Sequence, residues 1–178
     1  VARLAPHLRG SGLRVIANAG GVNPLACARM VQQLAPGLKV AVVTGDDILP
    51  RLDDLLARGI ELRNMDTGAP LAPLRAAVTS ANVYQGAFPI GEALATGAQV
   101  IVTGRCADAA LALAPMIHEF GWTPADHHLL SAGTIAGHII ECGSQSTGGN
   151  AQVDWQTMPD PANIGYPVLE AHPDGTCV

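Results

Sequence analysis

Arg105 and Asp108 stand three residues apart where an apolar run, V-I-V-T-G, gives way to a polar loop. A guanidinium at such a place could bind a ligand's carboxylate or phosphate through paired N–H groups, and the nearby carboxylate could act as an acid or base. Alternatively, Asp108 pairs only with Arg105 or caps the following helix. Because loops concentrate function and cations are few here, we favour ligand contact by Arg105.

Two more carboxylates, Asp46 and Asp66, are candidates for acid–base chemistry together with Asp108. Asp46 follows a second run of the same kind, V-A-V-V-T-G, and precedes a predicted helix, where its charge is favoured. Asp66 lies in N-M-D-T-G, outside the regular pattern, and would be a general base or a metal ligand. An Asx turn would explain Asp66 without any function.

Two small polar loops have the composition of ligand-binding loops. The first opens a predicted helix, where backbone N–H groups and the helix dipole attract anions. The second follows the predicted helix 127–142 and is long enough to wrap a polar ligand. A plain turn and a flexible linker are the respective alternatives, and neither loop has a nucleotide fingerprint. The candidate ligand-binding residues are Asn18, Gly20, Gly21, Asn23, Thr103, Arg105, Thr147, Gly148 and Asn150.

One predicted helical face presents an imidazole, a carboxylate and a thiol. His138, Glu141 and Cys142 have the i, i+3, i+4 spacing that suits zinc or an activated thiol. No second pair of Cys or His lies nearby in sequence, and Gly133 and Gly137, four apart with alanines beside them, indicate a helix that packs closely on a neighbour. We therefore predict no metal site, and expect a buried histidine beside a structural cysteine; no cofactor is predicted either.

The elements that position these residues alternate between strand and helix. Unbroken Val/Ile runs are typical of strands buried on both faces of a parallel sheet, whose carboxyl-end loops form the ligand crevice. Residues 60–79 are expected to leave the core. We predict a single three-layer α/β domain over residues 1–178, with a mostly parallel sheet. The expected strands are 13–17, 39–43, 99–102 and 166–170, and the expected helices are 2–9, 24–34, one from about 46 to 58, 80–97, 108–120 and 127–142.

Composition limits the classes of partner. Only 14% of residues are charged, against about 25% in an average domain, so we expect a partner subunit or more of the same chain to cover part of the surface. The first residue is Val1, and the last residues, D-G-T-C-V, resemble an interrupted strand, so we expect a fragment incomplete at both ends. A net charge of −5 without a basic stripe argues against nucleic acid.

Two further sequence features concern the cellular setting. No apolar run reaches the length of about 18 residues that a membrane-spanning helix needs, so no membrane partner is expected. The four cysteines form no C-x-x-C pair, which favours free thiols in the cytoplasm over a disulfide framework.

Several motifs together resemble the acyclic terpene utilisation family, formerly a domain of unknown function, and they cover nearly the whole chain in order. The motifs are N-A-G-G-V-N-P (18–24), N-M-D-T-G (64–68), S-A-N-V-Y-Q-G-A (80–87), V-T-G-R-C-A-D-A-A-L-A-L-A-P (102–115), H-E-F-G-W (118–122), G-H-I-I-E-C-G-S-Q-S-T-G-G-N (137–150) and N-I-G-Y-P (163–167). The resemblance implies a longer protein, with a Gly-rich strand and loop before residue 1.

The resemblance also implies a role in bacterial breakdown of acyclic isoprenoids such as citronellol and geraniol, through acyl-CoA intermediates. We therefore expect an enzyme acting on a branched acyclic acid or its CoA thioester, in a lyase or hydratase type of reaction. A dehydrogenase is less favoured because no dinucleotide fingerprint is present. The alternative is a non-catalytic binding or scaffold subunit of a catabolic enzyme complex.

Overall fold

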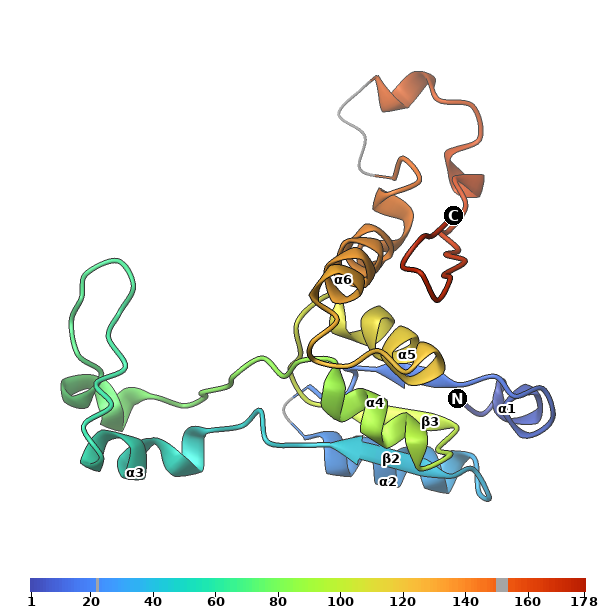
Figure 1. The fold of residues 1–178 in the computed structure, drawn as a ribbon. Helices are drawn as coiled ribbons and strands as arrows, with labels where there is room; N and C mark the ends of the chain where they lie inside the picture. The colour runs from blue at the N-terminus through green and yellow to red at the C-terminus, as the bar shows by residue number, and fades with distance from the viewer. Residues whose placement is uncertain (22, 150–153) are drawn as a thin grey trace.

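The computed structural model describes residues 1–21, 23–149 and 154–178. At the centre of the fold is a three-stranded parallel sheet (Figure 1). The sheet has the order β1-β3-β2 and places β3 in the middle. Every residue of β3 is buried, because Val and Ile side chains fill both faces. This confirms the predicted α/β class with a parallel sheet. The strands are β1 (Val15–Ala17), β2 (Val40–Val43) and β3 (Val100–Thr103).

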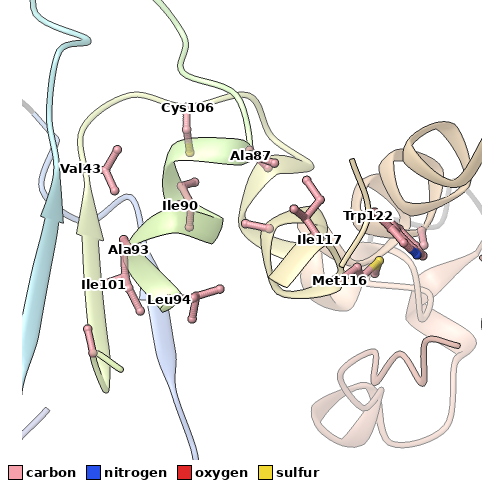
Figure 2. Close-up of a cluster of buried hydrophobic side chains, with 14 residues drawn as sticks. Val43, Ala87, Ile90, Ala93, Leu94, Ile101, Cys106, Met116, Ile117 and Trp122 are labelled. Atoms are coloured by element: carbon pink, nitrogen blue, oxygen red, sulfur yellow. The ribbon is translucent and has the colours of Figure 1, made fainter. Parts of the chain in front are cut away.

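Helices cover both faces of this sheet, so the sheet is the middle of three layers. One face packs against α1 (Ala5–Gly10) and α2 (Pro24–Leu34) through a cluster that includes Val100 and Val102 of β3. The other face packs against α4 (Phe88–Ala95) and α5 (Ala110–Phe120). Figure 2 shows this second cluster running from Ile101 on the sheet to Trp122.

A last helix, α6 (His127–Glu141), packs on α5 through small residues. A Cβ atom on Gly137 would lie 2.8 Å from the carbonyl oxygen of Ala109, and one on Gly133 would lie 2.7 Å from Leu113 Cδ1. The two backbones therefore approach closely only because these positions are glycine. The sequence prediction that Gly133 and Gly137 serve close helix packing is confirmed.

Residues 49–79, here called the arm, project away from the sheet (Figure 1). The arm contains α3 (Leu52–Ala57) and the 3₁₀ turns Leu49–Arg51 and Ala72–Ala77. Its two ends are joined by a bidentate pair, with Arg75 Nε and Nη2 at 2.9 and 3.0 Å from the Asp53 carboxylate. The prediction that residues 60–79 leave the core is confirmed. The preceding helix, α3, lies outside the core as well (Figure 1).

Two predicted elements are wrong. The helix predicted over 80–97 begins only at Phe88, because residues 80–87 run extended and pair with the loops after β2 and β3. In the described C-terminal part no strand covers 166–170. Pro167 has no backbone N–H and cannot donate to a neighbouring strand. Instead the backbones of Glu170 and Val178 hydrogen-bond to each other at 2.8 and 2.9 Å. The described residues from Gly143 on contain 3₁₀ turns at Gly143–Gln145, Trp155–Thr157 and Pro161–Asn163, and an isolated antiparallel bridge between Ala171 and Cys177.

Among the residues placed in the structure, no helix combines the length and apolar character needed to cross a membrane. All four cysteines are free, as the sequence predicted.

Candidate functional site

The loops after the three strands meet at the carboxyl edge of the sheet. The loop after β1 lies directly against the end of β3, since a Cβ atom on Gly20 would come within 2.6 Å of both Pro24 and the carbonyl oxygen of Thr103. Gly21 follows in the left-handed region, at φ 48°. Glycine is therefore needed at both positions, once for space and once for backbone conformation.

Asp46 joins the loop after β2 to the loop after β3. It is 3% exposed, and its Oδ2 atom accepts hydrogen bonds from Asn82 Nδ2 and from the backbone nitrogen of Arg105, both at 2.9 Å. The carboxylate also packs against Gly104, where a Cβ atom would lie 2.0 Å from Oδ1. Asp46 thus fixes the direction in which the chain leaves β3 toward Arg105.

Residues 80–87, which we call the crossing segment, run across the carboxyl ends of β2 and β3. Val83 donates its N–H to the carbonyl of Asp46 at 2.8 Å, and Gln85 donates to that of Arg105 at 3.1 Å. The Gln85 carbonyl in turn accepts from Ala107 at 2.9 Å. The sequence predicts a helix here, although V-Y-Q within S-A-N-V-Y-Q-G-A carries a β-branched and an aromatic residue, which favour strands.

The crossing segment brings Tyr84 beside Arg105. Arg105 Nη2 donates to Tyr84 Oη at 3.0 Å, and the guanidinium carbon lies 5.2 Å from the ring centroid. The hydrogen bond to Tyr84 is the main cause that raises the pKa of Arg105 above its ordinary value. Within the described ranges no ion pair joins Arg105 to Asp108, so the guanidinium is held by the phenol instead.

Three adjoining hollows along this edge form one open trough. A polar hollow of about 380 Å³ and a central one of about 180 Å³ share Gly21, Tyr84 and Arg105. The central hollow shares Asn18 and Asp108 with a third hollow of about 340 Å³ that extends between α5 and α6. The polar hollow adds Ser80 and Asn82, and the third adds Leu111, Ala112, Gly137, Ile140 and Glu141.

The two ends of the trough differ in chemistry. The end near Ser80 has Arg105 as its cation, whereas the end between α5 and α6 has an apolar wall of Leu111, Ala112 and Ile140. Asp108 lies between them, because it lines both the central and the apolar hollow. The trough can therefore hold an anionic group at one end and a hydrocarbon chain at the other.

Two thiols lie near the trough, and neither is activated. Cys106 is 5% exposed in the central hollow, and burial raises its pKa. Cys142 follows α6 and donates a hydrogen bond to Glu141 Oε2 at 3.0 Å, which raises its pKa as well. Both side chains are therefore protonated thiols at neutral pH.

Five of the sequence-predicted residues line the trough, namely Asn18, Gly21, Arg105, Asp108 and Glu141. Gly20, Asp46 and Thr103 are packed behind it, with the Thr103 hydroxyl donating to the Gly104 carbonyl at 2.8 Å. Asn23 caps α2 by accepting from Ala26 N at 2.9 Å. It faces a separate hollow between the loops after β1 and β2, which is also lined by Asp46 and Asp47.

The other predicted residues lie elsewhere. Asp66 is exposed on the arm, in a turn closed by Asn64 Oδ1, which accepts from the backbone nitrogens of Asp66 and Thr67 at 2.9 and 2.8 Å. Thr147 Oγ1 donates to the carbonyls of Ser144 and Gly165. Gly148 has φ 113°, and Asn150 lies outside the described residues.

His138 and Cys142 are both exposed, so the expectation of a buried histidine beside a structural cysteine is wrong. The reason is that α6 turns its glycine face, Gly133 and Gly137, toward α5, and His138 therefore points to solvent. In the described part of the chain, no three His, Cys, Asp or Glu side chains gather closely enough to hold a metal ion.

Comparison with known proteins gives one match. The family model described as "Acyclic terpene utilisation family protein AtuA" matches residues 1–178. No curated protein and no solved structure matches the chain.

Proposed function

Because this chain belongs to the acyclic terpene utilisation family AtuA, we propose that it is an enzyme acting on a branched acyclic acid or its CoA thioester. The observation that carries the proposal is the trough, which joins the Arg105–Tyr84 pair at one end to the apolar wall of Leu111 and Ile140 at the other. A branched isoprenoid acid has the same two parts, an anionic head and a hydrocarbon tail.

Asp108 is the proposed acid–base residue. It lies between the cationic and the apolar end, next to the first carbon atoms of a substrate whose head contacts Arg105. A carboxylate there can take a proton from a water molecule as its oxygen bonds to one carbon of a double bond, and return a proton to the neighbouring carbon. This supports a hydratase or, in reverse, a lyase reaction.

The proposal assigns Asp46 a positioning role. Its buried carboxylate holds the Arg105 backbone and the Asn82 side chain, so it acts on the substrate only through them. Free cysteines, including the exposed Cys142 and Cys177, support a reducing, cytoplasmic setting.

A scaffold subunit is the second candidate function, and the arm favours it. Met65 at its tip is fully exposed and Leu74 is 60% exposed, although both are apolar. In addition, β1 and β2 each pair on one side only in the described structure, which leaves sheet edges for a second subunit or for more chain. In this case the arm, and not the trough, would carry the function.

Metabolite profiling of a deletion strain grown on citronellol tests the two candidates. We expect the substrate to accumulate in the deletion strain, and its level to return to normal when the wild-type gene is restored. Asp108→Asn should fail to clear it although the protein is produced and folded, while Asp66→Asn on the arm, the matched control, should clear it as wild type does. Full clearance by Asp108→Asn, or failure of Asp66→Asn alone, would contradict the proposed site.

A further inference from the structure

We propose that the trough takes a free carboxylic acid rather than a CoA thioester, and that Tyr84 and Arg105 hold its carboxylate together. The inference rests on the proposed function and narrows the substrate class that it leaves open. It follows from the charges along the trough and from the geometry of the Tyr84–Arg105 pair.

In the part of the chain that the structure describes, the trough has a single cation, which can match one negative charge on the head of a ligand. Among the described residues that line it, Arg105 is the only Lys, Arg or His, whereas Asp108 and Glu141 are both acidic. A CoA thioester carries roughly four negative charges at neutral pH, because its phosphate monoester carries nearly two and its diphosphate about two more. A free acid carries one, which a single guanidinium can match.

Four other cations are occupied away from this edge. Arg14 and Lys39, which precede β1 and β2, donate to the carbonyls of Leu94 and Thr96 at the opposite, amino edge of the sheet. Arg75 and Arg63 pair with carboxylates of the arm. A CoA phosphate in the trough would therefore meet Asp108 and Glu141 without a second cation to offset them.

The geometry of the pair suits a carboxylate. Tyr84 Oη accepts from Arg105 Nη2 at 3.0 Å, which leaves the phenolic hydrogen to donate to a ligand oxygen. Arg105 keeps its other N–H groups for the same ligand. The guanidinium carbon lies 5.2 Å from the ring centroid, and both side chains line the two hollows that Gly21 also lines.

Calorimetric titration of the full chain tests the inference with three probes that share one tail: citronellate, citronellyl-CoA and citronellol. We expect citronellate to bind at least tenfold more tightly than the other two. If citronellyl-CoA binds as tightly as the acid or more so, this inference is overturned while the proposed function stands. If neither the acid nor the thioester binds, the proposed function itself fails, and this inference with it.

Two substitutions test the pair itself. Tyr84→Phe keeps the ring and should weaken citronellate binding about tenfold, as expected for one hydrogen bond to a charged group, and Arg105→Gln should weaken it further. The matched controls are Tyr166→Phe and Arg29→Gln, which replace exposed residues that do not line the trough. Unchanged binding by Tyr84→Phe would remove Tyr84 from the proposal, and a control that weakens binding equally would overturn the assignment to this pair.

Discussion

Asp46 Oδ2 lies 2.9 Å from the backbone nitrogen of Arg105, although the two residues are 59 positions apart. The same oxygen accepts from Asn82, so one buried carboxylate fixes the loops after β2 and β3 and the crossing segment between them. The position of the Arg105 guanidinium therefore depends on a residue that does not reach the trough surface.

Replacement of Asp46 by Ala should lower the free energy of unfolding by about 2–3 kcal/mol, because two donors lose their acceptor inside the protein. Asp47→Ala is the matched control, since its exposed carboxylate accepts a hydrogen bond from the backbone nitrogen of Leu49 at 3.0 Å, and no other among the described residues. The control should lose at most about 1 kcal/mol. Urea denaturation measures the free energy of unfolding of both variants. Equal losses would contradict a larger contribution of the buried Asp46 hydrogen bonds.

Gly104→Ala should destabilise the protein strongly, since the new methyl group would lie 2.0 Å from Asp46 Oδ1. We expect a loss of about 2 kcal/mol or more, as for overpacking that the backbone must absorb. Gly86→Ala provides the comparison, because a Cβ atom there meets nothing within 4 Å. Thermal unfolding of both variants decides the matter: a Gly104→Ala protein as stable as Gly86→Ala would refute the close contact.

Glu141→Gln should speed the alkylation of Cys142 by iodoacetamide at pH 8. The Glu141 carboxylate raises the pKa of this thiol by accepting its hydrogen, so removal of the charge increases the fraction of reactive thiolate. Site-resolved mass spectrometry gives the rate, with the exposed Cys177 as internal reference and Glu119→Gln on α5 as control variant. An unchanged rate at Cys142 would contradict the contact.

Asp126, just before α6, should make a contribution to stability that disappears in acid. Hydrogen bonds from the backbone and hydroxyl of Thr123 lower its pKa below the ordinary value of 3.8. A carboxyl whose pKa is lower in the folded state stabilises the fold above its unfolded pKa, and the effect is lost as the pH falls through the folded pKa. We expect Asp126→Ala to be less stable than wild type at pH 7.

The difference between Asp126→Ala and wild type should shrink below about pH 5, where the unfolded carboxyl begins to protonate. Chemical denaturation repeated from pH 7 to pH 2.5 measures it. Thr123→Val loses the hydroxyl but keeps the backbone donor. It should lower the free energy of unfolding by less, with the same dependence on pH. A difference that is independent of pH would mean that Asp126 acts only through packing or helix propensity.

The strands and the loops that follow them were predictable because the signal is local. The run V-I-V-T is fully buried in the middle of the parallel sheet and V-A-V-V is largely half-buried at its edge, and hydrophobicity alone marks both runs. The close packing of Gly133 and Gly137 was predictable for the same reason, since small residues four apart share one helix face.

The crossing segment was not predictable, because its partners are distant in sequence. Val83 and Gln85 extend only because the backbones of Asp46 and Arg105 accept their N–H groups. No pattern within residues 80–87 shows that these acceptors exist. For this reason the sequence does not indicate Tyr84 as a site residue, and the only side-chain partner that it suggests for Arg105 is Asp108, its neighbour in sequence.

A crystal structure of the protein with citronellate tests the central claim, that the trough holds an acid by its head and its tail, most directly. We expect the carboxylate within about 3 Å of the Arg105 guanidinium and of Tyr84 Oη, and the hydrocarbon chain past Asp108 against Leu111 and Ile140. Citronellate bound with its carboxylate away from Arg105, or outside the trough altogether, would contradict the account.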